Sequence, residues 1–381
     1  MKRKWKIFLS VLSGVVLFIV LLVAFRYPIL EWLLSKQMSK QNIPGVTITL
    51  INDNAIKWSR SYGVIKNGSG VPVSTETLFQ AASVTKTLVA ALALNFVEKG
   101  MIGLDEDIND YLRSWQLPGN EFTDKKKVTL RLLLTHRSGL PETNLSYENG
   151  PPPSLVQVLK GEAPALNKPA IVEYIPGSRW QYSNIAYAVI QLLIEDVGGQ
   201  SIEKIMQAVI FKPLHMKNST FVYPLAGEFS NQKEAMPHDD YGKAYPAALH
   251  PTAVAQGGLL STSADIAKFL IALMRSYQGE SGLIISRDMV RQMFMKEIDL
   301  DPKILGGIPA AQGLGVFIAK GDKFYIFSVG DNAPGSTCWA VGIPEIGKGT
   351  VVMTNGHRGF DLSIKIIGAL LITNLWPMPD M

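Results

Sequence analysis

The sequence predicts an α/β fold in which one antiparallel sheet, built from both ends of the chain, is flanked by helices, with a mostly helical region inserted in the middle. Alternating apolar and polar residues at 46–50 and 56–62, with turn residues between them, indicate a hairpin near the start. Short apolar runs near the end indicate four more strands, at residues 314–319, 324–328, 337–341 and 350–354. Strands at both ends with helices between them favour a single sheet that both ends complete.

Helical spacing of apolar residues predicts the elements that cover this sheet. A long helix begins around Ser83 and stops at Gly100, a residue type that commonly ends helices. Further helices are expected at residues 155–159, 186–197, 202–210, 264–273 and 362–375. We therefore expect one large domain at residues 35–381, with the helical insertion at about 106–250.

Composition and charge exclude several classes of protein. Of the 381 residues, 47% are hydrophobic and 18% are charged, a balance that supports a large packed core. The five basic residues that precede the first acid account for the whole net charge of +5: Lys2, Arg3, Lys4, Lys6 and Arg26. The rest of the chain is neutral on balance, so nothing in it favours nucleic-acid binding. The five histidines form no i, i+4 pair, so we expect no metal site and no cofactor.

An uncharged run at residues 7–25 follows the basic cluster. As a helix this run is about 28 Å long, close to the thickness of the hydrocarbon core of a bilayer. The basic flank favours a cytoplasmic N-terminus, with everything after Arg26 outside the cytoplasm. A cleaved signal peptide is the alternative, but the run is longer than a usual signal-peptide core and no clean small-x-small cleavage site follows it. We therefore expect a single-pass membrane protein whose residues 1–34 form a cytoplasmic tip and a transmembrane anchor.

Ser83 and Lys86 lie at the predicted start of the long helix. Residues at i and i+3 share a helix face, so the lysine amine can reach the serine oxygen. A serine hydroxyl is a weak nucleophile until a base takes its proton, and a buried lysine can do so because burial disfavours its charged form. The same spacing recurs at Ser201 and Lys204, where the serine fits a helix N-cap, so spacing alone does not select the first pair.

Four segments, in this order along the chain, favour Ser83 and Lys86 over Ser201 and Lys204: residues 77–86, 100–105, 133–141 and 257–269. Together they resemble the nucleophile block, the turn after its helix and two further signatures of the serine β-lactamase and penicillin-binding-protein superfamily. The resemblance is to the branch that holds class C β-lactamases, D-Ala-D-Ala carboxypeptidases and related esterases. It implies that residues 35–381 are a catalytic domain in which Ser83 attacks a carbonyl, forms an acyl-enzyme and so hydrolyses an ester or amide.

Members of this family carry a Tyr-x-Asn motif, for which the chain offers two candidates. Tyr182 and Asn184 precede an apolar helix, as in the family, whereas Tyr147 lies in a Pro- and Gly-rich loop without supporting context. The resemblance implies that Tyr182 and Lys86 move the Ser83 proton. It also implies that Asn184 binds the substrate and the lysine. A phenol with a pKa near 10 needs a neighbouring cation to act as a base, and we expect Lys86 to be that cation.

The third family motif, a basic residue followed by x-Gly on the strand beside the nucleophile, is altered in this chain. The matching positions hold Ser328 and Gly330, so the positive charge is missing. By resemblance, the N–H groups of Ser83 and Asp331 form the oxyanion hole, and Gly330 allows the substrate to approach closely. A serine donates a hydrogen bond but brings no charge, and charge-assisted hydrogen bonds are about twice as strong as neutral ones. We therefore expect weaker recognition of the carboxylates of β-lactam or D-Ala substrates. Among small-molecule, peptide or ester substrates, this favours an esterase or amidase that acts on a neutral acyl substrate, or low activity.

A catalytically silent protein that keeps this fold to bind a ligand or partner is the alternative. The missing charge at Ser328 favours it, whereas the retention of four polar residues favours the enzyme: Ser83, Lys86, Tyr182 and Asn184. The sequence leaves open whether the substrate is a cell-wall peptide, a β-lactam or an ester, and it leaves the oligomeric state open.

Overall fold

The computed structural model describes residues 31–377, except 33, 148–149, 226–232, 246–251, 281–282, 306, 320–322, 324, 333–334 and 375. The expected transmembrane anchor at residues 7–25 lies outside the described residues. Within the described part of the chain, no helix is both long enough and apolar enough to cross a membrane.

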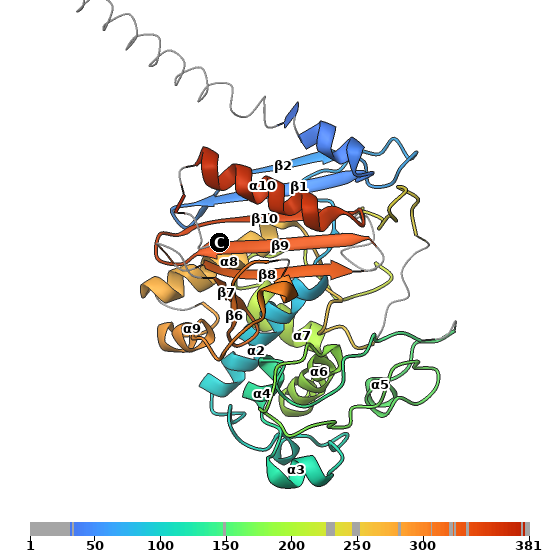
Figure 1. Ribbon diagram of the computed structural model, residues 1–381, viewed down its shortest axis with the longest axis vertical. Coiled ribbons are helices and arrows are strands. Elements are labelled where there is room, and N and C mark those ends of the chain that lie inside the picture. The colour runs from blue at the N-terminus through green and yellow to red at the C-terminus, as the bar shows by residue number, and fades with distance from the viewer. Residues whose placement is uncertain are drawn as a thin grey trace, which may run out of the picture.

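An eight-stranded antiparallel sheet forms the centre of the protein (Figure 1). Its strand order is β2-β1-β10-β9-β8-β7-β6-β5. The strands are β1 Gly45–Asn52, β2 Ala55–Gly63, β5 Ile298–Asp299, β6 Ala311–Gln312, β7 Phe317–Ala319, β8 Tyr325–Asn332, β9 Ser336–Ile343 and β10 Lys348–Thr354. The first strand pairs with the last, with Ile48 opposite Val352. The prediction of one antiparallel sheet completed by both ends of the chain is therefore confirmed.

The β1–β2 hairpin forms where the alternating pattern predicted it. Asn52 pairs with Ala55, so Asp53 and Asn54 alone make the loop. Both residues have positive φ, 51° and 54°, which the favoured two-residue hairpin turns require and which Asp and Asn tolerate. This turn sets the register of the hairpin and so decides which side chains face the core.

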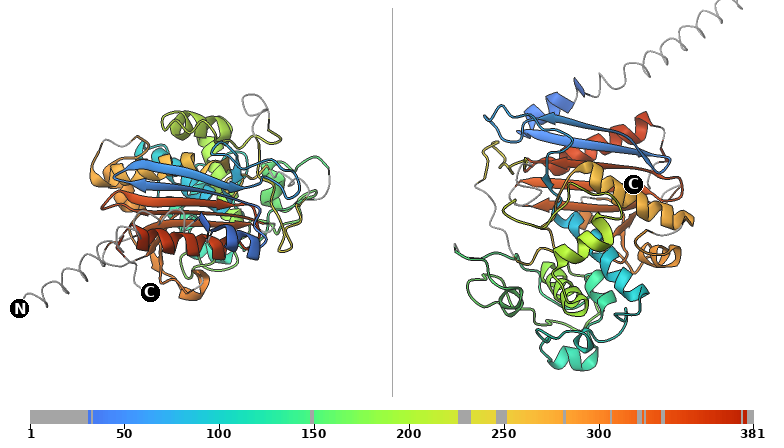
Figure 2. Two further views of the ribbon diagram at one scale, coloured as in Figure 1. Left: turned by 90° about the horizontal axis from the view of Figure 1, so that it is seen from above. Right: turned by 180° about the vertical axis from the view of Figure 1, so that it is seen from behind.

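Helices cover both faces of the sheet (Figure 2). α10 (Gly359–Thr373) and the helical residues 34–40 lie on one face, and α8 (Ser263–Gln278) lies on the other. Successive side chains of β9 point to opposite faces of the sheet and so pack against both helical layers. Trp339 packs on the α10 side and Cys338 on the α8 side. All eight residues of β9 are consequently buried.

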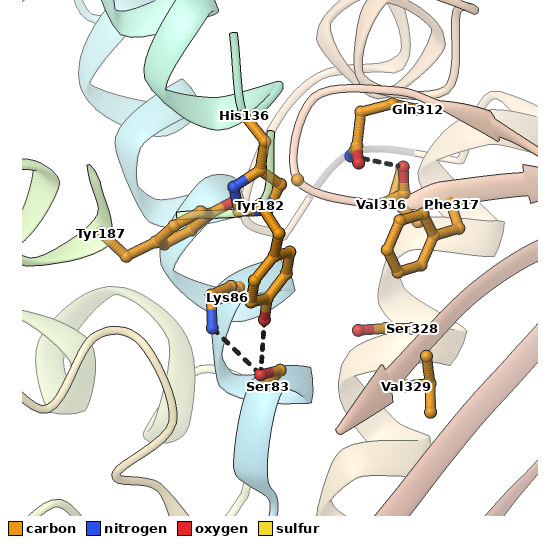
Figure 3. Close-up of a pocket in the computed structure, with 11 residues that line it drawn as sticks. Ser83, Lys86, His136, Tyr182, Tyr187, Gln312, Val316, Phe317, Ser328 and Val329 are labelled. Atoms are coloured by element: carbon orange, nitrogen blue, oxygen red, sulfur yellow. Dashed lines mark hydrogen bonds between the residues drawn. The ribbon is translucent and has the colours of Figure 1, made fainter. Parts of the chain in front are cut away.

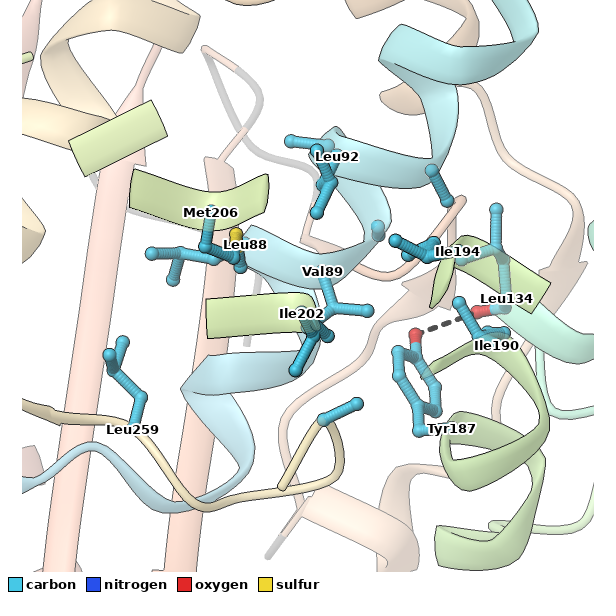
Figure 4. Close-up of a cluster of buried hydrophobic side chains, with 14 of the residues drawn as sticks. Leu88, Val89, Leu92, Leu134, Tyr187, Ile190, Ile194, Ile202, Met206 and Leu259 are labelled. Carbon is cyan, nitrogen blue, oxygen red and sulfur yellow. Dashed lines mark hydrogen bonds between the residues drawn. The ribbon is translucent and has the colours of Figure 1, made fainter. Parts of the chain in front are cut away.

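The helical region packs around α2 (Thr85–Glu98), which a 3₁₀ turn at Ala82–Val84 precedes. Leu88 and Leu92 of α2 gather with Tyr187 of α6 (Asn184–Gly198) in one apolar cluster (Figure 4). Further helices are α3 Glu121–Lys125, α4 Leu130–Leu134, α5 Leu155–Lys160, α7 Ile202–Met206 and α9 Arg287–Met293. Residues 85–96 of α2 are all buried, so the turn before this helix has a rigid support.

Two of the predicted elements take a different form in the structure. The helix expected at 202–210 is α7 followed by a π-helical turn, Gln207–Phe211. The strand expected at 314–319 is only the three residues of β7. Gly315 turns the chain there with φ of +72°, and its N–H donates to a carbonyl of α4 instead of to a strand.

Candidate active site

Ser83 lies in the 3₁₀ turn that leads into α2, and structure on both sides holds this turn in place. The chain before it forms β3 (Phe79–Gln80), which pairs with β4 (Leu260–Ser261). Ala82 has φ of +46°, a left-handed conformation that costs about 1–3 kcal/mol for a residue with a Cβ. The strand pair and the buried helix together impose this turn, which presents Ser83 to a pocket.

Lys86 comes from the first turn of α2 and is only 4% exposed. Its Nζ lies 3.0 Å from Ser83 Oγ and 2.9 Å from Asn184 Oδ1. The amine also donates to the backbone carbonyl of Gln256. Burial lowers the pKa of the Lys86 amine well below its ordinary 10.5. The predicted pair is therefore in hydrogen-bond contact, and its amine is biased toward the neutral form.

Tyr182 reaches Ser83 from the loop before α6 (Figure 3). Its hydroxyl donates to Ser83 Oγ at 2.7 Å. Burial raises the pKa of Tyr182 to about 12; the hydrogen bond to Ser83 opposes this shift, and the Glu142 carboxylate adds to it. Tyr182 therefore keeps its proton at neutral pH and acts as a donor. This differs from the expectation that a Lys86 cation makes the phenol a base.

The polar groups around Ser83 form a hydrogen-bond arrangement that a neutral lysine completes. A neutral amine has two N–H donors, which Asn184 Oδ1 and the Gln256 carbonyl accept. Its lone pair then faces Ser83 Oγ, which can donate its own proton because it already accepts from Tyr182. The arrangement can thus draw the serine proton toward Lys86, as a nucleophile paired with a base requires.

His136 packs against Tyr182, with 4.4 Å between the ring centroids. Burial and then the nearby Lys86 lower the pKa of His136 well below 6.5, so the ring is neutral. Its Nδ1 accepts from the Ser183 N–H at 3.2 Å, and its backbone carbonyl accepts from Gln181. His136 thus positions the segment that carries Tyr182. The resemblance placed this histidine in the signature at 133–141 and implied a structural role for it. Its partners could not be predicted, because the contacts join distant parts of the chain.

Strand β8 passes directly against the nucleophile turn at Gly330. A Cβ at this position would lie 2.4 Å from the Ser83 backbone nitrogen and 2.7 Å from the Ala81 carbonyl oxygen, so only glycine fits. Asp331 follows in the same strand, opposite Thr337 of β9. The structure therefore places the backbone of the third motif beside Ser83, where the resemblance put it.

Ser328 lies two residues before Gly330, on the same face of β8, and is buried in the pocket wall. No described residue makes a hydrogen bond to its hydroxyl. The remaining lining is mostly aromatic and apolar: Tyr187, Gln312, Gly315, Val316, Phe317 and Val329. Gln312 accepts from Trp180 and donates to the Val316 carbonyl, and so holds this wall together. The sequence carried no signal for Gln312, because only the turn between β6 and β7 brings it to the site.

The rival motifs lie outside this pocket. Ser201 precedes α7, its side chain makes no capping hydrogen bond, and neither it nor Lys204 lines the pocket. Tyr147 is buried and pairs with Ala165 in an isolated bridge, and residues 148–149 of its motif lie outside the described part of the chain. The structure thus brings together the motifs that the resemblance selected.

Comparison with known proteins identifies the family. The β-lactamase family model matches residues 30–372. The chain therefore belongs to the β-lactamase family. This family lies within the superfamily of serine hydrolases that holds the serine β-lactamases and penicillin-binding proteins, so the resemblance seen in the sequence is confirmed.

Three similar proteins match this chain over different lengths. A putative D-alanyl-D-alanine carboxypeptidase of Escherichia coli strain K12 is 25% identical over 339 residues, 85% of this chain and 75% of the relative. A protein of the same name from Escherichia coli O157:H7 is 30% identical over 202 residues, which cover 50% of this chain but only 46% of the relative. Flp of Staphylococcus aureus strain MRSA252 is 23% identical over 50% of this chain and 38% of its own length.

Solved structures share the fold across most of the chain. The octameric penicillin-binding-protein homologue of Pyrococcus abyssi has a TM-score of 0.76 and 25% identity, covering 92% of this chain and 78% of that one. The D-alanine carboxypeptidase AmpC of Burkholderia cenocepacia has a TM-score of 0.69 and 20% identity, covering 90% of this chain and 100% of that one. At 20% identity, the similarity to the AmpC structure shows only that the two proteins share a fold.

Proposed function

We propose that the protein hydrolyses an ester or amide through an acyl-enzyme on Ser83. The observation that carries this proposal is the position of Ser83 Oγ, 3.0 Å from Lys86 Nζ and 2.7 Å from the Tyr182 hydroxyl. A nucleophile, a base biased to its neutral form and a proton donor thus meet at one oxygen atom. Carboxypeptidase, β-lactamase and esterase reactions all use this chemistry. The relatives' names support the first of these reactions, and the family's name supports the second.

The proposed reaction begins when Lys86 takes the Ser83 proton and Ser83 Oγ attacks the substrate carbonyl. Negative charge develops on the carbonyl oxygen, where the N–H groups of Ser83 and Asp331 stabilise it. As the bond to the leaving group breaks, Tyr182 gives its proton to the leaving atom and recovers one from the Lys86 ammonium. Water then attacks the acyl carbon and loses a proton to Lys86. The bond from that carbon to Ser83 Oγ breaks, Oγ takes the proton back from Lys86, and the acid product leaves.

Asn184 serves both the base and the substrate in this scheme. Its Oδ1 accepts from Lys86 and so fixes the amine against Ser83. Its Nδ2 has no partner among the described residues, which leaves that donor for a polar group of the substrate. The side chain therefore links the position of the base to the position of the bound acyl group.

Covalent labelling tests this function. We expect the full-length protein in detergent to react with a fluorophosphonate probe, and peptide mapping to place the adduct on Ser83. A labelled penicillin, applied separately, reports whether the site also accepts a β-lactam. A protein that forms no Ser83 adduct with either reagent would refute the hydrolase and support the alternative of a catalytically silent binding protein.

A Gly330→Ala variant tests the oxyanion site. The new methyl group would meet the Ser83 backbone nitrogen at 2.4 Å and displace either β8 or the nucleophile turn. We expect the rate of acylation to fall about 10²–10³-fold, the usual effect of losing one oxyanion donor. Gly368→Ala is the matched control, because a Cβ there meets nothing within 4 Å. An unchanged acylation rate in a folded Gly330→Ala protein would show that β8 does not contribute to the oxyanion site.

We also propose that residues 1–34 anchor the hydrolase in the membrane, with the catalytic domain outside the cytoplasm. The uncharged run at 7–25 and the basic residues before it support this proposal. Mass spectrometry of the membrane fraction is expected to detect the intact N-terminus. A mature chain that starts near Phe25 would instead identify the segment as a cleaved signal peptide.

A further inference from the structure

The described lining of the pocket offers a substrate no free positive charge. Lys86 is the only lysine or arginine among those lining residues, and its amine is already engaged by three groups of the protein: Ser83 Oγ, Asn184 Oδ1 and the Gln256 carbonyl. His136 also lines the pocket, but its ring is buried and its Nδ1 already accepts from a backbone N–H. A substrate carboxylate placed here would therefore lose hydration without gaining a cation.

Ser328 marks the part of the pocket where this lack of charge matters. It shares a face of β8 with Gly330, which lies against Ser83. Figure 3 shows Ser328 across the pocket from Tyr182, with Phe317 and Val329 on the Ser328 side. A leaving group that takes its proton from Tyr182 therefore departs into the space that Ser328 borders. The serine hydroxyl can make a neutral hydrogen bond to such a group.

The carboxylate of Glu142 also disfavours a negatively charged substrate at this site. The exposed Glu142 carboxylate acts on Tyr182 and helps to hold its hydroxyl protonated. The same field disfavours an anion beside Tyr182. Because Glu142 is exposed, solvent and salt screen this effect and keep it smaller than the effect of the pocket lining.

We propose that Ser328 selects substrates whose leaving group carries no carboxylate, namely esters, thioesters or amides of an uncharged alcohol, thiol or amine. This inference rests on the proposed acyl-enzyme at Ser83 and adds the chemistry of the leaving group. It distinguishes the reaction from that of a carboxypeptidase, whose leaving group is an amino acid with a free carboxylate. The acyl carbon, the attack of Ser83 and the proton donated by Tyr182 are the same in both cases.

Two aryl acetates that differ in one charge test the proposal. The substrates are 3-acetoxybenzamide and 3-acetoxybenzoate, and the measurement is the ratio of their kcat/KM values, corrected for their uncatalysed hydrolysis. We expect the wild-type protein to favour the benzamide by about 10- to 100-fold, the range that corresponds to a hydrogen bond to a charged group. Where turnover is slow, competition of each ester with fluorophosphonate labelling yields the same comparison.

Variants at Ser328 separate charge from size. Ser328→Lys is expected to shift the ratio toward the benzoate at least about tenfold, because it places a cation beside the leaving group. In Ser328→Met, the new side chain is similar in length to lysine but uncharged. This variant is expected to retain the preference for the benzamide. Glu142→Gln should shift the ratio in the direction of Ser328→Lys, by a smaller factor that salt reduces.

The outcomes distinguish this inference from the function on which it rests. A wild-type protein that forms the Ser83 adduct but uses both esters equally, or prefers the benzoate, overturns the role of Ser328 alone. The same holds if Ser328→Met shifts the ratio as far as Ser328→Lys. A protein that forms no Ser83 adduct and turns over neither ester overturns the acyl-enzyme and this inference together.

Discussion

A Ser83→Ala variant is expected to lose all fluorophosphonate labelling and to lower kcat about 10⁶-fold, the scale seen when a serine nucleophile is removed from a hydrolase. The reason is that the hydroxyl of Ser83 is both the acceptor of the Tyr182 proton and the neighbour of Lys86. Without that oxygen, neither group has an atom to activate. Labelling intensity and steady-state turnover of a neutral aryl ester measure the loss.

Ser201, which repeats the Ser-x-x-Lys spacing, provides a matched control for this experiment. Ser201 has the same spacing to Lys204 but lies before α7 and does not line the pocket. Ser201→Ala is therefore expected to keep wild-type labelling and turnover. Labelling that survives in Ser83→Ala and disappears in Ser201→Ala would identify Ser201 as the nucleophile.

A Lys86→Met variant is expected to slow acylation of Ser83 about 10²–10⁴-fold, the usual contribution of a general base. Methionine keeps much of the length and apolar character of the buried chain but cannot accept a proton. In the double variant with Ser83→Ala, the two losses should not multiply, because the residues act as one unit. Full acylation by a folded Lys86→Met protein would exclude Lys86 as the base.

The same lysine predicts how the wild-type reaction depends on pH. Burial lowers the pKa of Lys86 well below 10.5, so the neutral base forms as pH rises through that lowered value. The rate of acylation should therefore rise with pH through one ionisation below 10.5 and then level off. The Tyr182 proton, with a pKa of about 12, remains in place across this range. Lys86→Met should lack this rise.

The stability of the protein should report the same ionisation. Between the lowered pKa and 10.5, the unfolded Lys86 amine is protonated while the folded amine is neutral. The free energy of unfolding therefore falls as pH is lowered through this window, by about 1.4 kcal/mol per pH unit. Urea denaturation at a series of pH values, taken as the difference between wild type and Lys86→Met, isolates this slope from other groups. A difference that does not change with pH would show that Lys86 ionises normally in the fold.

Local sequence patterns were sufficient to predict the long helices and strands of the fold. Strong alternation predicted β1 and β2, and Asp53 and Asn54 supplied the turn between them. The two-residue strands β5 and β6 could not be predicted, because two residues carry no periodicity. These two strands nevertheless place Gln312 and one wall of the pocket.

By itself, the spacing in the sequence determined that Ser83 and Lys86 share a helix face. The ordered motifs and the family resemblance that they carry joined Tyr182 and Asn184 to this pair and showed that the third motif lacks its charge at Ser328. Only the tertiary structure shows that the Tyr182 hydroxyl contacts Ser83 Oγ, and that Gln256 and His136 complete the surroundings. It also decided the protonation states, because the pKa values of Lys86 and Tyr182 depend on burial, and burial arises only when distant segments pack around them.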